Sequence, residues 1–157
     1  MIRDITAEDH GWVHALNKAH EVELSPLSPE DLAPHLAGAL YARQAEGGAF
    51  LIAFDQDGAY DSPNFLWFKE KFGRFLYVDR VAVAASHRRR GLAATLYEDL
   101  FSFAMARDLE RVVCEVNSDP PNPGSDAFHA ALGFEIVGER YLSDRDKTVR
   151  YMAKSLG

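Results

Sequence analysis

A strand–turn–helix–strand pattern in the middle of this 157-residue chain limits its fold more than any other feature. Residues 74–85, RFLYVDRVAVAA, are rich in valine and predict a strand, and residues 111–116, RVVCEV, predict another. Residues 92–109 between them predict a helix, whose apolar face is formed by Leu92, Leu96, Leu100 and Phe103. A helix that joins neighbouring strands is a crossover, so part of the sheet is expected to be parallel.

The flanking segments predict shorter elements. A strand is expected at residues 2–5, and a helix is expected to follow its cap, Thr6. A second helix is expected from the Ser28 cap to about residue 45, before Gly47 and Gly48. The other expected elements are a buried strand at 49–54, a long connection at 55–73, a short helix at 125–132, and an antiparallel pair at 134–142 and 148–156.

Composition narrows the class of protein. The chain has a formal net charge of -7 and an isoelectric point near 5.3, which argues against a nucleic-acid surface across the whole domain. A single cysteine, Cys114, excludes an internal disulfide and any zinc site built from several cysteines. The sequence shows no apolar run of transmembrane length and no signal-peptide pattern, so we expect one cytoplasmic domain with no membrane partner.

Positive charge gathers at one point of this acidic chain. Arg88, Arg89 and Arg90 stand directly before Gly91, between a predicted strand and a predicted helix. The first amide groups of a helix have no partner within it, and the helix dipole adds positive charge there. The run is therefore either a solvated charge cluster or a site for an anion such as a pyrophosphate. The glycine-rich patterns of Rossmann and phosphate-loop proteins are both absent.

The segment resembles a known family. RRRGLA, residues 88–93, matches the R/Q-x-x-G-x-G/A signature of the GNAT superfamily of acyl-coenzyme A-dependent N-acyltransferases, and residues 122–139, NPGSDAFHAALGFEIVGE, are similar to its second conserved block. YVDRVAV and RVVCEVN fall at the spacing of its fourth and fifth strands. The resemblance, which covers residues 75–156 well, implies a single α/β domain over residues 1–157. Its central sheet would be mixed and mostly antiparallel, splayed between the parallel fourth and fifth strands and flanked by helices.

The resemblance also implies an activity and a cosubstrate site. The chain would be an N-acetyltransferase that transfers an acetyl group from acetyl-coenzyme A (acetyl-CoA) to a primary amine of a small molecule or peptide by direct attack. Backbone amides near the arginines would hold the pyrophosphate, Val81 and Val83 would offer backbone groups to the pantetheine, and the second block would line the thiol. The residues implied in binding are Val81, Val83, Arg88, Arg89, Arg90, Gly91, Leu92, Ala93, Ala94, Asn122, Ser125 and Phe128.

Proton transfer needs further groups. An amine with a pKa near 10 is mostly protonated at neutral pH, so a base must accept its proton. Asp79 in the fourth strand and Glu115 in the fifth are the candidates. His129 stands where the resemblance implies a tyrosine beside the leaving thiolate, and a histidine can act as acid or base. Helical spacing predicts that Phe128 packs inward and that His129 faces the cleft.

Two other functions remain open on the sequence. A non-catalytic sensor that binds acyl-CoA is favoured by the missing tyrosine, and a nucleic-acid module is suggested only by the arginines. No metal site is expected, because four histidines lack ligand partners at suitable spacing: His10, His14, His20 and His35. A homodimer through a sheet edge is compatible with the sequence. The acceptor is not identified, although the connection at 55–73 offers four residues that could shape its cleft: Tyr60, Asp61, Phe65 and Trp67.

Overall fold

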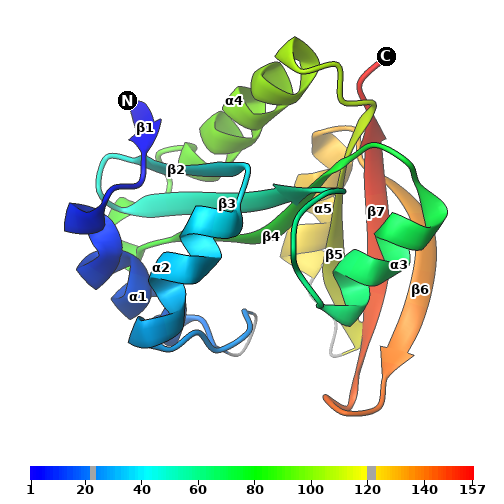
Figure 1. Cartoon of the computed structure of the whole chain (residues 1–157), viewed down its shortest axis with the longest axis horizontal. Coiled ribbons are helices and arrows are strands. Elements are labelled where there is room, and N and C mark those ends of the chain that lie inside the picture. The colour runs from blue at the N-terminus through cyan, green and yellow to red at the C-terminus, as the bar shows by residue number, and fades with distance from the viewer. Residues whose placement is uncertain (22–23, 120–122) are drawn as a thin grey trace.

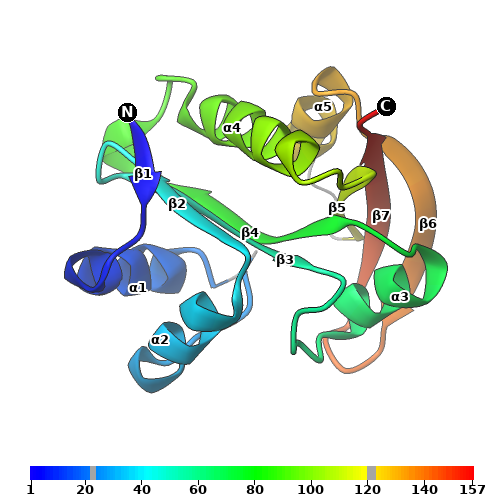
Figure 2. The ribbon, with the colours of Figure 1, turned by 45° about the horizontal axis from the view of Figure 1, so that its top comes forward.

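The computed structural model describes residues 1–21, 24–119 and 123–157, and its centre is a seven-stranded sheet in the order β1-β2-β3-β4-β5-β7-β6 (Figure 1). The strands are β1 (Ile2–Asp4), β2 (Tyr41–Ala45), β3 (Ala49–Asp55), β4 (Leu76–Val83), β5 (Arg111–Asp119), β6 (Glu135–Leu142) and β7 (Lys147–Ser155). The helices are α1 (His10–Ala19), α2 (Pro29–Gly38), α3 (Pro63–Lys71), α4 (Leu92–Ala106) and α5 (Pro123–Ala131), with short 3-10 turns η1 (Ala7–Asp9) and η2 (Ala85–His87). Helices α4 and α5 cover one face of the sheet, and α1, α2 and α3 cover the other (Figure 2).

The sheet is mixed and mostly antiparallel, which confirms the predicted fold class. Every neighbouring pair is antiparallel except β4 and β5. These two run parallel and pair only at Leu76 with Val112 and at Tyr77 with Val113. Beyond these two pairs the strands diverge, so the predicted splay is present.

A bulge in β4 accompanies the divergence. Ile52 of β3 pairs with Arg80 while its neighbour Ala53 pairs with Val78, which leaves Asp79 as an extra residue in β4. A bulge bends its strand and increases the local twist, so β4 turns away from β5 just past Tyr77. The bulge also places two successive side chains on one face, because Asp79 contacts α2 and Arg80 contacts α1.

One predicted helix is too long. The helix that begins after Ser28 ends at Gly38 instead of near residue 45, and β2 follows as the first strand of a hairpin with β3. The glycines at 47 and 48 belong to the hairpin turn, where Glu46 and Gly47 have φ of 53° and 67°. Such positive φ angles characterise tight hairpin turns, so these glycines had been misread as a helix stop.

The connection at residues 55–73 contains helix α3, which was not predicted from the sequence. Pro63 occupies the start of this helix, where its fixed φ and missing amide proton are tolerated. Phe65 and Phe68, three residues apart, are fully buried against the sheet. Turn residues before the helix had hidden this apolar spacing.

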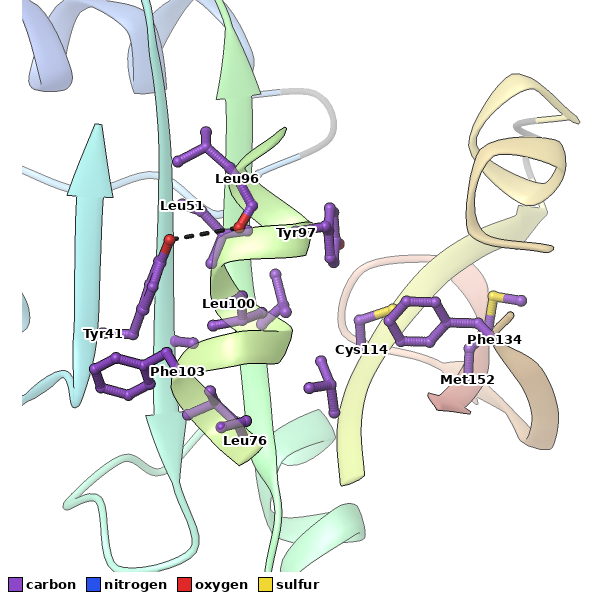
Figure 3. Packing of buried hydrophobic residues seen from close by; sticks show 14 of the residues in the cluster. Tyr41, Leu51, Leu76, Leu96, Tyr97, Leu100, Phe103, Cys114, Phe134 and Met152 are labelled. Carbon is purple, nitrogen blue, oxygen red and sulfur yellow. Dashed lines mark hydrogen bonds between the residues drawn. The ribbon is translucent and has the colours of Figure 1, made fainter. Parts of the chain in front are cut away.

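The buried side chains form one cluster on each face of the sheet. The cluster beneath α4 contains the predicted apolar face of that helix together with Tyr41, Cys114, Phe134 and Met152 (Figure 3). The cluster on the other face joins α1, α2 and α3 to the sheet through residues such as Phe65, Phe68 and Tyr77. In the described part of the chain, no helix is both long enough and apolar enough to span a membrane.

Candidate functional site

A cleft of about 810 Å³ opens where β4 and β5 diverge. One wall is the run Val78–Val83 of β4, and the other includes Cys114–Asn117 of β5. Helices α4 and α5 contribute Tyr97, Ser125, Phe128 and His129, while Arg88 lies at the cleft's edge. The cleft therefore brings together residues that the sequence had singled out in separate segments: Val81, Val83, Glu115, Ser125, Phe128 and His129.

The start of α4 has the features of an anion site. Gly91 precedes the helix with φ of 70°, a left-handed conformation that glycine adopts without strain, and no side chain of the described residues caps it. The helix therefore begins with amide groups that have no partner within it. Arg88, Arg89 and Arg90 are exposed beside it, although Arg90 also pairs with Glu46 at 3.1 Å between Nη1 and Oε1. The arginines thus flank the amides as the sequence predicted.

The other residues implied in cosubstrate binding do not all lie in the cleft. Val81, Val83, Ser125 and Phe128 line the cleft. The side chain of Leu92 is buried in the core, so this residue has only its backbone amide to offer. Asn122 lies outside the described residues.

Glu115 is held on the floor of the cleft by neutral donors. The Tyr77 hydroxyl lies 2.8 Å from Oε2, and the Asn64 amide donates to Oε1 at 3.1 Å. Tyr151 in turn donates to Asn64 at 2.9 Å. Burial raises the pKa of Glu115 to about 7 and the Asp79 charge adds to this, although the hydrogen bonds from Tyr77 and Asn64 act in the opposite direction. Glu115 is therefore a carboxyl group that gains and loses a proton near neutral pH.

Asp79 has a different environment. Its carboxylate accepts from His35 Nε2 at 2.8 Å, from the Tyr60 hydroxyl at 2.6 Å and from Arg80 Nε at 2.6 Å. Burial alone would raise its pKa, but the hydrogen bond from His35 and the Arg80 charge outweigh burial and lower it. Asp79 is thus ionised, and its oxygens are occupied by the neighbouring Arg80 and by partners from two other segments, His35 and Tyr60. Such a group stabilises the strand better than it accepts a proton.

His129 lines the cleft as predicted, but it is more deeply buried than a residue that simply faces the cleft. The residue is only 6% exposed. Phe128 packs against the core as predicted, but it is the more accessible of the two. The Ser125 carbonyl, which can only accept, lies 2.7 Å from Nδ1, so Nδ1 carries the proton. Nε2 then accepts from the Tyr97 hydroxyl at 3.0 Å. Burial lowers the pKa of His129, which keeps the ring neutral.

Several cleft residues were not found from the sequence. Tyr97 lies on α4 next to the predicted apolar face and projects toward α5 (Figure 3). The sequence placed Tyr77 in a predicted strand and Asn64 in the connection at 55–73, with no role in the site for either. Of the four acceptor candidates, Tyr60 lines the cleft, whereas Asp61, Phe65 and Trp67 do not. Within the described ranges, no three His, Cys, Asp or Glu side chains are grouped to hold a metal ion.

The raised pKa of Glu115 has a consequence for stability. Its pKa rises from an ordinary value near 4.5 to about 7 on folding, so between these values the folded state binds more protons than the unfolded state. Stability then falls as pH rises through this window. Because Glu115→Gln removes the buried charge, we expect it to stabilise the protein at pH 8 by up to about 3 kcal/mol, and by nearly nothing at pH 4.5. Urea unfolding at the two pH values measures this; an equal effect at both would contradict it.

Comparisons with known proteins agree with this architecture. The family model described as "Acetyltransferase (GNAT) family" matches residues 35–134, well over half of the chain. A search of curated proteins found no match.

Solved structures show the same fold. The ribosomal-protein-S18-alanine N-acetyltransferase of Escherichia coli superposes with a TM-score of 0.72 at 18% identity, covering 100% of this chain and 94% of that one. The ribosomal-protein-alanine N-acetyltransferase of Brucella melitensis gives 0.74 at 20% identity, covering 99% of each chain. NAA60 of Arabidopsis thaliana, solved with a bisubstrate analogue, gives 0.74 at 13% identity and covers 99% and 97%. At these identities the likeness concerns the fold alone.

Proposed function

Since this chain belongs to the GNAT acetyltransferase family, we propose that it is an N-acetyltransferase that moves the acetyl group of acetyl-CoA to the primary amine of an acceptor. The observation that carries the proposal is the single cleft that joins the edge of the α4 anion site to a carboxyl group with a pKa near 7. The first feature suits a pyrophosphate, and the second suits proton removal from an amine.

The residues present fit acetyl-CoA. The uncapped start of α4 supplies amides and arginines for the pyrophosphate, and β4 beyond Tyr77 has no strand paired on its β5 side among the described residues. Backbone groups of Val81 and Val83 on this side could pair with the pantetheine as an added strand would. When bound, acetyl-CoA supplies an activated thioester carbonyl. The chain's own task is to orient the amine and to move its proton.

Glu115 is the base in this proposal. A base works best when its pKa lies near the working pH, and Glu115 meets this condition whereas Asp79 does not. Tyr77 and Asn64 fix the carboxylate by donating to it, which leaves acceptor capacity toward the cleft. A proton from the amine passes to Glu115 directly or through one water.

On the thiol side, the proposal assigns the hydrogen-bond donor to Tyr97. His129 has its only proton committed to the Ser125 carbonyl, so the ring has none to give to a thiolate. In this structure the Tyr97 hydroxyl donates to His129 Nε2 at the same wall. Its O–H rotates about the C–O bond and can turn from Nε2 to a thiolate in the cleft, whereas the Nδ1 proton of His129 is fixed in the ring plane. His129 thus serves as a positioning residue for the tyrosine that donates.

The first test is binding of acetyl-CoA. A ligand that binds only the folded state raises the melting temperature as its concentration rises, so we expect a graded increase. Gly91→Val should weaken binding by tenfold or more, because a β-branched residue is strained at φ of 70° and would distort the turn that presents the amides. Calorimetry at 20 °C measures the affinity of the folded protein directly.

Arg90→Ala is the matched control for this test. Its side chain is exposed and already paired with Glu46, so its loss should weaken binding less than Gly91→Val does. A melting temperature that stays flat up to millimolar acetyl-CoA, with no heat of binding, would sink the proposal.

A measurement of acetyl-CoA turnover distinguishes a non-catalytic sensor from an enzyme. The hydrogen-bonded His129, in place of a free donor at that position, is the observation that favours a sensor. Thiol release from acetyl-CoA across a panel of amines decides between the two. An enzyme releases coenzyme A faster with at least one amine than without any, whereas a sensor binds acetyl-CoA and releases none above background.

A further inference from the structure

The end of the cleft beyond Glu115 is formed by β7 and the turn before it. Glu115 pairs with Tyr151, and Asn117 pairs with Val149. Side chains two residues apart in a strand share a face, so Lys147 lies on the same face as Val149 and Tyr151. Tyr151 stacks on Trp67 with ring centroids 4.1 Å apart, which identifies this as the α3 face. Lys147 therefore continues the surface on which Glu115 stands.

Two cations line this end of the cleft, Arg145 and Lys147. Lys147 is partly buried, and among the described residues its ammonium has no ion-pair partner within 4.0 Å. Arg145 meets only Asp144, at 4.0 Å, and the Asp144 side chain is 70% exposed. Burial lowers the pKa of Lys147 and the neighbouring Arg145 lowers it further, while the Glu115 and Asp144 charges act in the opposite direction without outweighing them. Among the described residues, Lys147 thus has no anion in contact, and the one carboxylate beside Arg145 is exposed.

The other charges in the cleft do not cancel this excess. Asp79 and Arg80 neutralise each other at 2.6 Å. Glu115, with a pKa near 7, carries only part of a negative charge at neutral pH. The remaining residues on the acceptor side, among them Ser25, Tyr60 and Ser62, are neutral. A bound anion at this end would therefore find two cations and little opposing charge.

The two cations are not placed to serve the pyrophosphate. The β6–β7 turn lies on the α3 side of the sheet, whereas α4 begins on the opposite face and at the other end of β4 (Figures 1 and 2). Arg88 stands at that other end. The two groups of cations thus mark two separate anion positions in one cleft.

We propose that the acceptor carries a carboxylate besides its amine, and that Lys147 and Arg145 bind this carboxylate while Glu115 faces the amine. Lys147 is four residues along β7 from the partner of Glu115, about 13 Å at the usual rise of a strand. The carboxylate then lies several bonds from the amine, as in an ω-amino acid or in a peptide with an acidic side chain near its N-terminus. This inference rests on the proposed N-acetyltransferase function.

Paired substrates test the inference by turnover. With saturating acetyl-CoA, we expect kcat/KM for 6-aminohexanoate to exceed that for its methyl ester by about tenfold, a usual scale for one charged contact. Lys147→Gln should remove this advantage through KM, with kcat retained, and should leave the ester unaffected. A peptide that begins Ala-Glu, compared with one that begins Ala-Gln, shows whether the carboxylate belongs to a small molecule or to a peptide.

Lys69→Gln is the matched control, because Lys69 is an exposed cation of α3 that does not line the cleft. A binding readout separates this inference from the proposed function. Without acetyl-CoA, 6-aminohexanoate should raise the melting temperature of the wild type and of Lys69→Gln more than that of Lys147→Gln. Equal shifts in all three proteins overturn the carboxylate site, whether or not any amine is acetylated. Absence of thiol release with every amine overturns the function instead.

Discussion

Turnover of acetyl-CoA with an acceptor amine will fall by roughly 10²–10⁴-fold in Glu115→Gln, the scale expected when a positioned base is lost. Glutamine has nearly the same shape, and its carbonyl oxygen can still accept from Tyr77 and Asn64. The variant therefore keeps the hydrogen-bond network and loses the ability to take a proton. Acetyl-CoA affinity should change little, because the α4 amides are untouched. Steady-state thiol release and calorimetry measure the two quantities.

The dependence of kcat/KM on pH provides a second test of Glu115 as the base. Glu115 must be ionised to accept a proton, so kcat/KM of the wild type should rise through about pH 7 and level off above it. In Glu115→Gln this limb disappears. Asp79→Asn is the control: Asp79 is already ionised at these pH values, so that variant should lose stability and retain the limb. A normal limb in Glu115→Gln assigns the base elsewhere.

Tyr97→Phe will lower turnover by about 10²-fold, the lower end of the range for a positioned proton donor. The substitution removes one oxygen from a fully buried ring and keeps its packing against Phe128 and Phe134. His129→Phe should lower turnover to a similar extent, because the tyrosine then loses the acceptor that orients it. Both effects should appear in kcat rather than in the affinity for acetyl-CoA.

A double-mutant cycle distinguishes the roles of the two side chains. If Tyr97 and His129 act as one unit, the double variant should be about as slow as either single variant, since non-additivity marks residues that work together. If His129 itself donates to the thiolate, His129→Phe alone will be slow and Tyr97→Phe will turn over at nearly the wild-type rate. Near-normal turnover in both single variants would make the pair structural.

The sequence predicted correctly those elements whose structure depends mainly on neighbouring residues in the chain. The apolar spacing of α4 and the valine-rich segment of β4 each lie within one element, and their burial follows from periodicity. The arginines before Gly91 lie at a turn whose geometry is set by a few neighbouring residues. Strand β2 was missed because its identity comes from pairing with β1 and β3, which a single segment does not reveal.

The proton-transfer residues depended on contacts across the sheet. From the sequence Asp79 was the first candidate base and Glu115 the second, and each is a carboxylate in an apolar strand. The bulge in β4 places Asp79 among His35, Tyr60 and Arg80, whereas Glu115 meets only neutral donors. Opposite directions of pKa shift follow from these neighbours, which lie between 1 and 51 positions away in the chain.

The divergence of β4 from β5 divides the sheet into two halves, β1 to β4 and β5 to β7, that share few backbone hydrogen bonds. Two residue pairs are the whole ladder between its halves in the described chain, so their cohesion comes chiefly from side chains, above all from α4, which packs on strands of both halves. An extended ligand lying in the gap bridges the halves as a strand would. The binding free energy of such a ligand then also stabilises the contact between the two halves of the sheet. The two halves are therefore held together more strongly in the occupied molecule than in the empty one.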